Sequence, residues 1–134
     1  VLVMSIGGAA GPLYGTLLME LGRGLPDAPD AADFAATLGR AVEAVSRRGR
    51  SRPGDKTLLD VLYPVQAEVA GFAAPARIAE CAQSAARATQ MMLARRGRAS
   101  YLGERSVGHE DPGASSCALL ATTICLYLKE HVAP

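Results

Sequence analysis

Hydrophobic residues recur at intervals of three and four along most of this chain, which is the spacing of one face of an α-helix. The pattern predicts five helices and no convincing strand, with the earliest helix over residues 12–21. The apolar stripes of the later helices are Phe34, Leu38, Ala41, Val42 and Val45; Leu58, Val61, Leu62, Val65 and Val69; Ile78, Cys81, Ala82, Ala85, Ala88 and Met92; and Leu119, Leu120, Ile124, Tyr127 and Leu128.

Three helix starts carry residues suited to that position. Pro12 and Pro112 fit the first helical position, because the N–H that proline lacks would be unsatisfied there. Asp30 and Asp111 precede helical stretches and can accept a hydrogen bond from the first turn as N-caps. We therefore expect helices to begin just after Asp30 and at Pro112.

Other residues predict where helices end or bend. Gly49 suits the left-handed residue that closes a helix, and Pro64 should bend its helix or end it early. Met91 and Met92 are interpreted as core filling. The apolar residues 1–6 are interpreted as the last turns of a helix that begins upstream, so we expect one domain over residues 1–134 that lacks its amino-terminal helices.

Composition favours closely packed helices and excludes several classes of protein. Hydrophobic residues make up 49% of the chain, yet aromatic residues make up only 4% and there is no Trp, so the core must consist of Ala, Leu, Val, Ile and Met. The formal net charge is +1, which gives no field that would attract nucleic acid or a membrane surface.

The cysteines indicate a reducing compartment. Cys81, Cys117 and Cys125 are odd in number and widely spaced, so they predict neither a disulfide framework nor a zinc cluster. We interpret them as buried free thiols. The apolar opening is too short to span a membrane and lacks the basic flank of a signal peptide. A cytoplasmic location fits these features best.

Glycine-rich or basic loops precede three helix starts, in residues 7–12, 49–57 and 97–113. Helix N-termini attract anions because their free N–H groups and dipole face the ligand. The chain has neither a Walker A pattern nor G-x-G-x-x-G, and it lacks the strand that both motifs need. We infer a phosphate-bearing ligand in another kind of fold. The basic residues near these loops are Arg48, Arg50, Lys56, Arg95, Arg96 and Arg98.

Four segments resemble the nucleotide-binding L subunit, or L domain, of the dihydroxyacetone kinases. Residues 7–16 read G-G-A-A-G-P-L-Y-G-T, and residues 53–57 read P-G-D-K-T. Residues 94–106 read A-R-R-G-R-A-S-Y-L-G-E-R-S, and residues 108–114 read G-H-E-D-P-G-A. The order and spacing of the segments also agree, and the resemblance spans essentially the whole chain.

The resemblance implies a closed barrel of eight antiparallel helices, of which this chain would hold the last five. It implies that ADP or ATP binds in the loops at one end, that a K subunit or K domain holds dihydroxyacetone, and that the activity is that of a kinase. The phosphoryl donor is either ATP or a partner of the phosphotransferase system that rephosphorylates bound ADP. The chain alone is expected to be inactive.

The resemblance also implies a set of nucleotide contacts, carried over by position along the chain; the catalytic residues stay unassigned. Residues 9 and 10 would border the phosphates, residues 49 and 58 would lie near the base, residue 98 would reach the nucleotide, and residues 111–113 would complete the pocket wall. The contacts are Ala9, Ala10, Gly49, Leu58, Arg98, Asp111, Pro112 and Gly113.

Two features depart from the family. Ala10 stands where the family usually has Ser, which removes one phosphate donor. The family's aspartate-rich motif, which binds two Mg²⁺ bridging the phosphates, has no counterpart here, so the metal ligands are expected upstream and no metal ligand is assigned in this chain. Asp27, Asp30 and Asp33 follow the first glycine segment instead of preceding it, and are interpreted as turn and cap residues.

Several alternatives stay open. The chain could be a non-catalytic nucleotide-sensing or protein-interaction module derived from the family, and an exposed apolar interior could be closed by self-association into a homo-oligomer. His109 is interpreted as a residue that organises its loop and not as a metal ligand, because the chain has only two histidines. Asp55 and Lys56 are expected to shape the site, since both lie beside a helix start.

Overall fold

The computed structural model describes residues 10–95 and 103–131, and it places five α-helices in these two stretches. The helices are α2 (Ala10–Gly24), α3 (Ala31–Gly49), α4 (Leu59–Ala70), α5 (Pro75–Ala88) and α6 (Pro112–His131), and a short 3-10 helix, η1 (Thr89–Met91), follows α5. No strand occurs in either stretch. The prediction of an all-α chain with five helices is confirmed.

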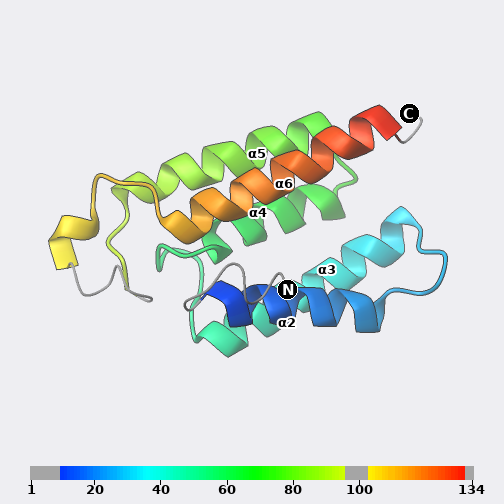
Figure 1. Ribbon diagram of the computed structural model, residues 1–134, viewed down its shortest axis with the longest axis horizontal. Coiled ribbons are helices and arrows are strands. Elements are labelled where there is room, and N and C mark those ends of the chain that lie inside the picture. The colour runs from blue at the N-terminus through cyan, green and yellow to red at the C-terminus, as the bar shows by residue number, and fades with distance from the viewer. Residues whose placement is uncertain (1–9, 96–102, 132–134) are drawn as a thin grey trace.

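The helices form an antiparallel array in which each one packs beside the next (Figure 1). α5 and α6 lie side by side, α4 lies behind them, and α2 and α3 form the lower part of the view. Because successive helices run in opposite directions, residues 50–58, 92–95 and 103–111 lie at one end of the molecule. The fold thus gathers two of the glycine-rich or basic loops together.

The core consists of the small aliphatic residues that the composition predicts. Val42 and Val45 on α3 are fully buried, as are Leu59 and Val61 on α4. Helices α5 and α6 present mainly alanine and cysteine to this core, and such small residues let two helix axes approach closely. The buried residues of these two helices are Ala82, Ala86, Ala114, Cys117, Ala118 and Cys125.

The predicted helix caps are confirmed. The Asp30 carboxylate accepts a hydrogen bond from the Asp33 backbone N–H at 2.7 Å, and the Asp33 carboxylate accepts one from the Asp30 N–H at 3.1 Å, which makes a reciprocal capping box at the start of α3. The Asp111 carboxylate accepts from the Ala114 N–H at 2.9 Å at the start of α6, with Pro112 as the first helical residue.

One prediction about helix ends is wrong. Gly49 is the last residue of α3, and Arg50 instead adopts the left-handed conformation that closes the helix, with φ of 50°. Of the two effects expected of Pro64, an early end does not occur, since α4 continues through it to Ala70, and a bend stays a prediction. A proline removes only one backbone hydrogen bond, and the burial of the neighbouring Val65 favours continuation.

Two predictions about burial are also wrong. Met91 is 81% exposed, because α5 gives way to η1 at Thr89 and the helical period on which the prediction depended ends there. The apolar stripe expected on α6 lies largely in solvent, because α6 packs through its small residues instead. The exposed large residues of α6 are Leu119, Leu120, Ile124, Leu126, Tyr127 and Leu128.

Candidate functional site

The starts of α2, α4 and α6 lie at the same end of the array (Figure 1). Each helix begins within or directly after one of the glycine-rich or basic segments. Three helix N-termini therefore lie at the same end as the C-terminal ends of α3 and α5. At the starts of α4 and α6, the side chains of Asp60 and Asp111 already accept backbone N–H groups, so the start of α2 is the helix end where no such cap is found among the described residues.

Leu58 and Gly113 meet between the starts of α4 and α6. A Cβ atom added to Gly113 would lie 3.6 Å from the Leu58 backbone nitrogen and 3.7 Å from the Leu58 Cβ. The same atom would lie only 3.0 Å from the Asp111 Oδ2. The distances to Leu58 are ordinary van der Waals contacts, so the two chain segments pack against each other there, and the tight contact is with the Asp111 carboxylate. Three residues expected to contact the nucleotide are thus neighbours in space.

Gly49 lies against the start of α2. A Cβ atom at this position would lie 3.3 Å from the Leu13 Cδ2 and 3.3 Å from the Ser51 Oγ, so a larger residue would displace one of these side chains. Ala10 is the first residue of α2, one turn before Leu13. The structure therefore brings the end of α3 beside the helix start that carries Ala10.

Asp60 organises the loop that holds the P-G-D-K-T segment. Its buried carboxylate accepts hydrogen bonds from the Gly54 N–H at 2.6 Å and from the Thr57 N–H at 2.9 Å. Gly54 takes a positive φ of 98°, which suits a residue without a Cβ atom. The sequence reasoning missed Asp60, although Thr57 followed three residues later by an acidic residue is a capping pattern that could have identified it.

Lys56 is buried behind this loop, with 2% of its surface exposed. Its ammonium group donates to the Met92 carbonyl at 3.2 Å and to the Ser106 carbonyl. Asp55 contributes through its backbone, since its carbonyl accepts from the Arg95 N–H at 3.1 Å. Through these contacts, Asp55 and Lys56 connect the loop before α4 to the segments that follow α5.

Thr89 is a second residue that the sequence reasoning missed. Its fully buried hydroxyl accepts from the Asp111 N–H at 2.9 Å and donates to the Ala86 carbonyl at 2.6 Å. A lone threonine inside an alanine-rich helical pattern gives little signal in a sequence, because threonine is common on helix surfaces. Only the structure shows that the buried Thr89 hydroxyl connects the end of α5 to the start of α6 by hydrogen bonds.

The electrostatics of this end centre on Asp111. Burial raises the pKa of its carboxyl group above the ordinary value of 3.8, while hydrogen bonds from the Ala114 and Gly113 N–H groups and the positive charge of Lys56 act in the opposite direction. The negative charge of Asp60 adds to the rise. Asp111 is thus a buried carboxyl group whose pKa is raised by burial and by Asp60 and lowered by the neighbouring N–H groups and by Lys56.

Tyr14 links α2 to the start of α6. Its hydroxyl is buried beside the Cys117 thiol and near Asp111, without a hydrogen-bond partner of good geometry among the described residues. Burial, with smaller contributions from Cys117 and Asp111, raises the pKa of Tyr14 well above its usual range. Burial likewise raises the pKa of the Cys117 thiol to about 12. Both groups are therefore neutral at physiological pH.

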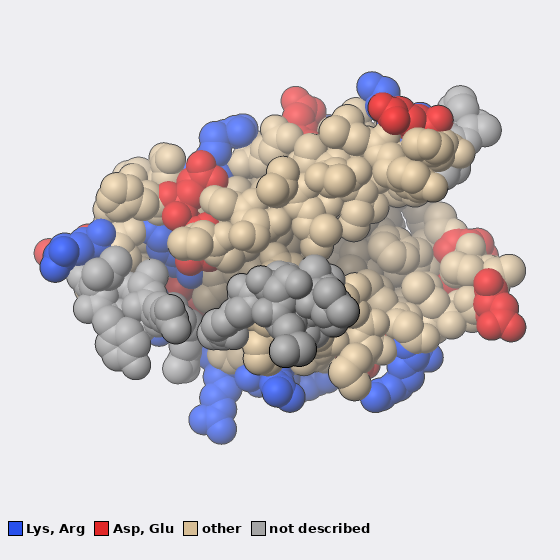
Figure 2. Space-filling model, viewed as in Figure 1, with Lys and Arg blue, Asp and Glu red and all other residues tan. Residues whose placement is uncertain are grey.

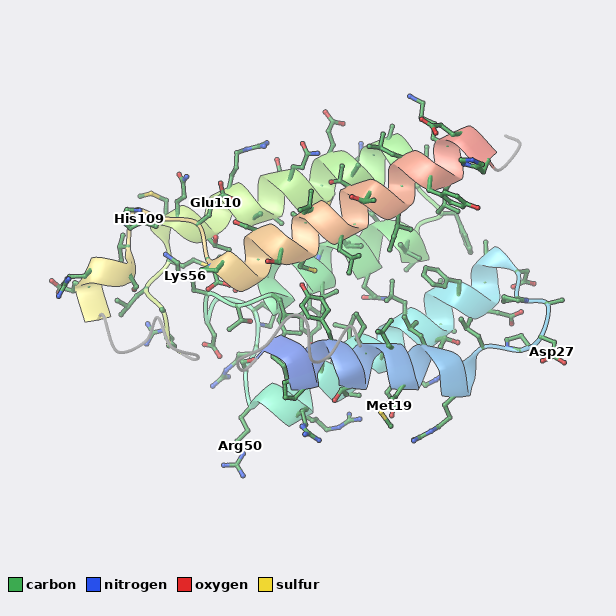
Figure 3. The ribbon with its side chains drawn as sticks, in the orientation of Figure 1. Met19, Asp27, Arg50, Lys56, His109 and Glu110 are labelled. Carbon is green, nitrogen blue, oxygen red and sulfur yellow. The ribbon has the colours of Figure 1, made fainter. Side chains whose placement is uncertain are left out.

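A basic hollow of about 380 Å³ opens beside Gly49. Arg50 projects from the molecule at this end, whereas Lys56 lies inside, near His109 and Glu110 (Figure 3). The ion pairs found in the described ranges, Arg23 with Glu20 and Arg77 with Glu68, use none of the hollow's arginines. The hollow is lined by Ser46, Arg50, Ser51, Arg52, Asp55 and Arg95.

The structure brings Gly49, Leu58, Asp111, Pro112 and Gly113 to one end of the molecule. Ala10 also lies there as the first residue of α2. Ala9 and Arg98 were expected to contact the nucleotide as well, and both lie outside the described residues. Pro112 is exposed and therefore lies at the rim of this region. Leu58 and Asp111 are buried and therefore belong to its wall.

The described residues do not fit a magnesium site. Residues 10–95 and 103–131 contain no group of three or more His, Cys, Asp or Glu side chains that could hold a metal ion. Asp60 and Asp111 are both occupied by backbone N–H groups at helix starts, and His109 lies exposed on its loop. Within the same ranges, none of the helices has the length and apolar character needed to cross a membrane.

The sequence matches the DAK2 domain family over residues 1–126. It is 37% identical over 139 residues to the ADP-binding subunit of the PEP-dependent dihydroxyacetone kinase of Escherichia coli, a match covering 96% of this chain and 66% of that subunit. The corresponding subunit of kinase 1 of Listeria innocua is 39% identical over 120 residues, covering 89% of this chain and 59% of the relative.

A third relative belongs to a larger protein. The D-erythrulose kinase of Mycolicibacterium smegmatis is 41% identical over 128 residues, a match that covers 88% of this chain and 22% of the kinase. The chain therefore spans no more than 66% of the length of these relatives.

Proposed function

Because the chain belongs to the DAK2 domain family and is an L-type domain of the dihydroxyacetone kinase kind, we propose that it binds the nucleotide for a phosphoryl transfer to dihydroxyacetone. The observation that carries this proposal is the meeting of Leu58, Asp111 and Gly113 at an end where three helices begin. Asp111 and Gly113 belong to one of the segments that carry the family resemblance, and Leu58 directly follows another. Relatives named as ADP-binding subunits support ADP or ATP as the ligand.

Each part of the site would have a separate task. The backbone at the start of α2 would border the phosphates, with Ala9 and Ala10 acting only through their backbone. Leu58 and Gly49 would contact the base, and Arg98 would add a charge-assisted donor. Asp111, Pro112 and Gly113 would close the wall. With Ala10 in place of Ser, the phosphates lose one donor, typically worth about 0.5–1.5 kcal/mol net.

Phosphoryl transfer requires little covalent chemistry from the protein, since positioning and charge stabilisation supply most of the catalysis. A domain that only holds the nucleotide therefore suits this reaction. The acceptor would be held by a K subunit or K domain, and the chain by itself would not catalyse the phosphoryl transfer. The donor would be ATP or a phosphotransferase-system partner; relatives named as PEP-dependent and PTS-dependent support the second.

Magnesium would accompany the nucleotide and neutralise charge on its phosphates. Its ligands would come from outside the described residues, because these contain no suitable group of side chains. A cytoplasmic location follows from the proposed partners and from the free thiols, since each of the three cysteines is unpaired.

The test is isothermal titration of Mg·ADP into this chain and into a form extended upstream by its native gene sequence. We expect the extended form to bind, and Arg98→Ala to weaken its affinity about tenfold, which corresponds to about 1.4 kcal/mol. Arg23→Ala is the matched control, because Arg23 is an exposed arginine in the last turn of α2. Absence of binding by both forms would overturn the proposal.

A second candidate function is a protein-interaction module, and the exposed face of α6 favours it. This helix carries no charged side chain before Lys129, and the face seen in Figure 2 is largely uncharged. An apolar surface of this kind is rarely left in water. A second copy of the chain is the occupant that this uncharged face suits, because it needs no charge complementarity. Failure of both forms to bind ADP, together with self-association, would favour this function.

A further inference from the structure

Lys56 is unusual among the basic residues of this chain because it is buried. A lysine is seldom fully buried unless its charge is compensated, since removing an ammonium group from water is costly. Lys56 also takes a left-handed backbone conformation, with φ of 64°, which is uncommon for a residue with a Cβ atom. Two unfavourable features at one residue call for a role that offsets them.

The contacts of Lys56 are with backbone carbonyls and not with a carboxylate. Its Nζ donates to the Met92 and Ser106 carbonyls, and within the described ranges no acidic side chain lies at ion-pair distance from it. At longer range, the Asp111 carboxyl group at the start of α6 feels the positive charge of Lys56 and also the negative charge of Asp60 in the first turn of α4. Lys56 is thus the buried positive charge that acts on Asp111.

The two carbonyls belong to segments that also support Asp111. Met92 follows η1, whose first residue, Thr89, accepts from the Asp111 N–H at 2.9 Å. The Ser106 hydroxyl accepts from the Ala94 N–H at 2.9 Å and donates to the Gly103 carbonyl at 2.7 Å. One ammonium group therefore ties the loop before α4 to the turn after α5 and to the segment that leads to α6.

We propose that Lys56 is a positioning residue of the nucleotide site: its buried ammonium group holds three loops together, so that Leu58 and Gly113 stay in contact and a positive charge stays near Asp111. The inference rests on the proposed function, because it assumes that a nucleoside diphosphate binds at these helix starts. Lys56 itself acts through the wall residues and through its charge, which favours an anionic ligand nearby. The Lys56 charge also lowers the pKa that burial raises in Asp111.

Three variants separate the hydrogen bonds of Lys56 from its charge. Lys56→Met removes both, Lys56→Gln keeps an N–H donor without the charge, and Lys56→Arg keeps the charge and the donors. Lys129→Gln is the matched control, because Lys129 lies exposed in the last turn of α6. Each variant is made in this chain and in the upstream-extended form.

The first readout is hydrogen exchange, which needs no ligand. In Lys56→Met the amides of Ala94, Gly108 and Asp111 should exchange at least about tenfold faster, while those of Val42 and Val45 in α3 keep their protection. Wild-type protection at all three loop amides would overturn the inference. If Lys56→Met loses protection in α3 as well, the variant has unfolded, and Lys56→Gln decides the question.

The second readout is the affinity for Mg·ADP as a function of pH. In the extended form, Lys56→Gln should weaken binding about tenfold, and the loss of affinity on acidification should begin at higher pH than in the wild type, because the carboxyl of Asp111 then has no nearby positive charge. Lys56→Arg should restore most of the affinity. Tyr14, Asp60 and Lys56 are the titratable groups that face Asp111, and of these only Lys56 is changed.

The outcomes distinguish the two proposals. A wild-type extended form that binds no ADP overturns the proposed function, and with it this inference. A wild type that binds, with a Lys56→Gln variant of equal affinity and unchanged pH profile, overturns the inference alone. A uniform loss of affinity in Lys56→Gln without a shift of the pH profile would also contradict it, because that result indicates a merely structural lysine.

Discussion

The Thr89 hydroxyl accepts a hydrogen bond from the Asp111 N–H at 2.9 Å and so joins the end of α5 to the start of α6 across 22 residues of sequence. The same hydroxyl donates to the Ala86 carbonyl at 2.6 Å, so it acts both as an acceptor and as a donor. Asp111 in turn caps α6 through its side chain. One buried hydroxyl thus orients the residue from which the wall of the candidate site begins.

Replacing Thr89 by Val keeps the shape of the side chain and removes this link. The Asp111 N–H would remain buried without a partner, which costs about 1–3 kcal/mol. We expect the free energy of unfolding, measured with urea, to fall by that amount. Thr123→Val is the matched control, because the Thr123 hydroxyl bonds within α6 at an exposed position, and it should change stability by less than about 0.5 kcal/mol. Equal effects of the two variants would contradict the assignment.

Asp111 should make stability depend on pH in a defined direction. Burial raises its folded-state pKa above 3.8, so the folded chain binds this proton more tightly than the unfolded chain does. The stability that Asp111 contributes is therefore complete below the unfolded pKa and is lost as pH rises through the folded pKa.

Asp111→Asn does not titrate and can still cap α6 through its amide oxygen. We expect the stability of the wild type relative to this variant to fall as pH rises from about 3 to about 7, measured by urea unfolding at each pH. A relative stability that rises over this window would show that the carboxylate is favoured by folding, contrary to the direction given by its burial.

The packing of Gly113 against Asp111 can be tested with alanine. In Gly113→Ala the added Cβ would lie 3.0 Å from the Asp111 Oδ2, so the carboxylate must move by a few tenths of an ångström and weaken its hydrogen bond to Ala114, at a cost of about 1 kcal/mol. The affinity for Mg·ADP in the extended form should fall as well. Gly22→Ala is the control, because nothing lies within 4 Å of its added Cβ and alanine favours the helix by about 0.5–1 kcal/mol. Gly113→Ala with wild-type stability and affinity would refute this view of the wall.

The exposed stripe of α6 should drive self-association of this chain. Leu119 is 69% exposed and Ile124 is 51% exposed, on a helix without charge before Lys129. We expect analytical ultracentrifugation to show a concentration-dependent mass above that of the monomer, and the double variant Leu119→Gln, Ile124→Gln to shift the chain toward monomer. Arg87→Gln, at an exposed position on α5, should have no effect. A monomer at all concentrations would remove the basis for the interaction module.

Most of the secondary structure could be read from the sequence because its causes are local. The capping pair Asp30 and Asp33, and the Asp111-Pro112 start, depend on residues within one helical turn, so each was found without knowledge of the rest of the chain. The error at Gly49 has the same origin, because propensity ranks residues at a helix end without fixing which one takes the left-handed conformation.

By itself, the sequence determined the helical class, the starts of α3 and α6 and the membership of its segments in one family, since periodicity, capping and motif spacing depend on residues that are close in the chain. The start of α2 was expected at Pro12, and the helix begins at Ala10. Only the tertiary structure decided that Lys56, Thr89 and Asp60 support the wall, because their partners lie in other loops or gain importance through burial. It likewise decided that Met91 and Leu119 face solvent. The physical reason is that burial depends on which face of a helix its neighbours cover, and the helical period does not encode those neighbours.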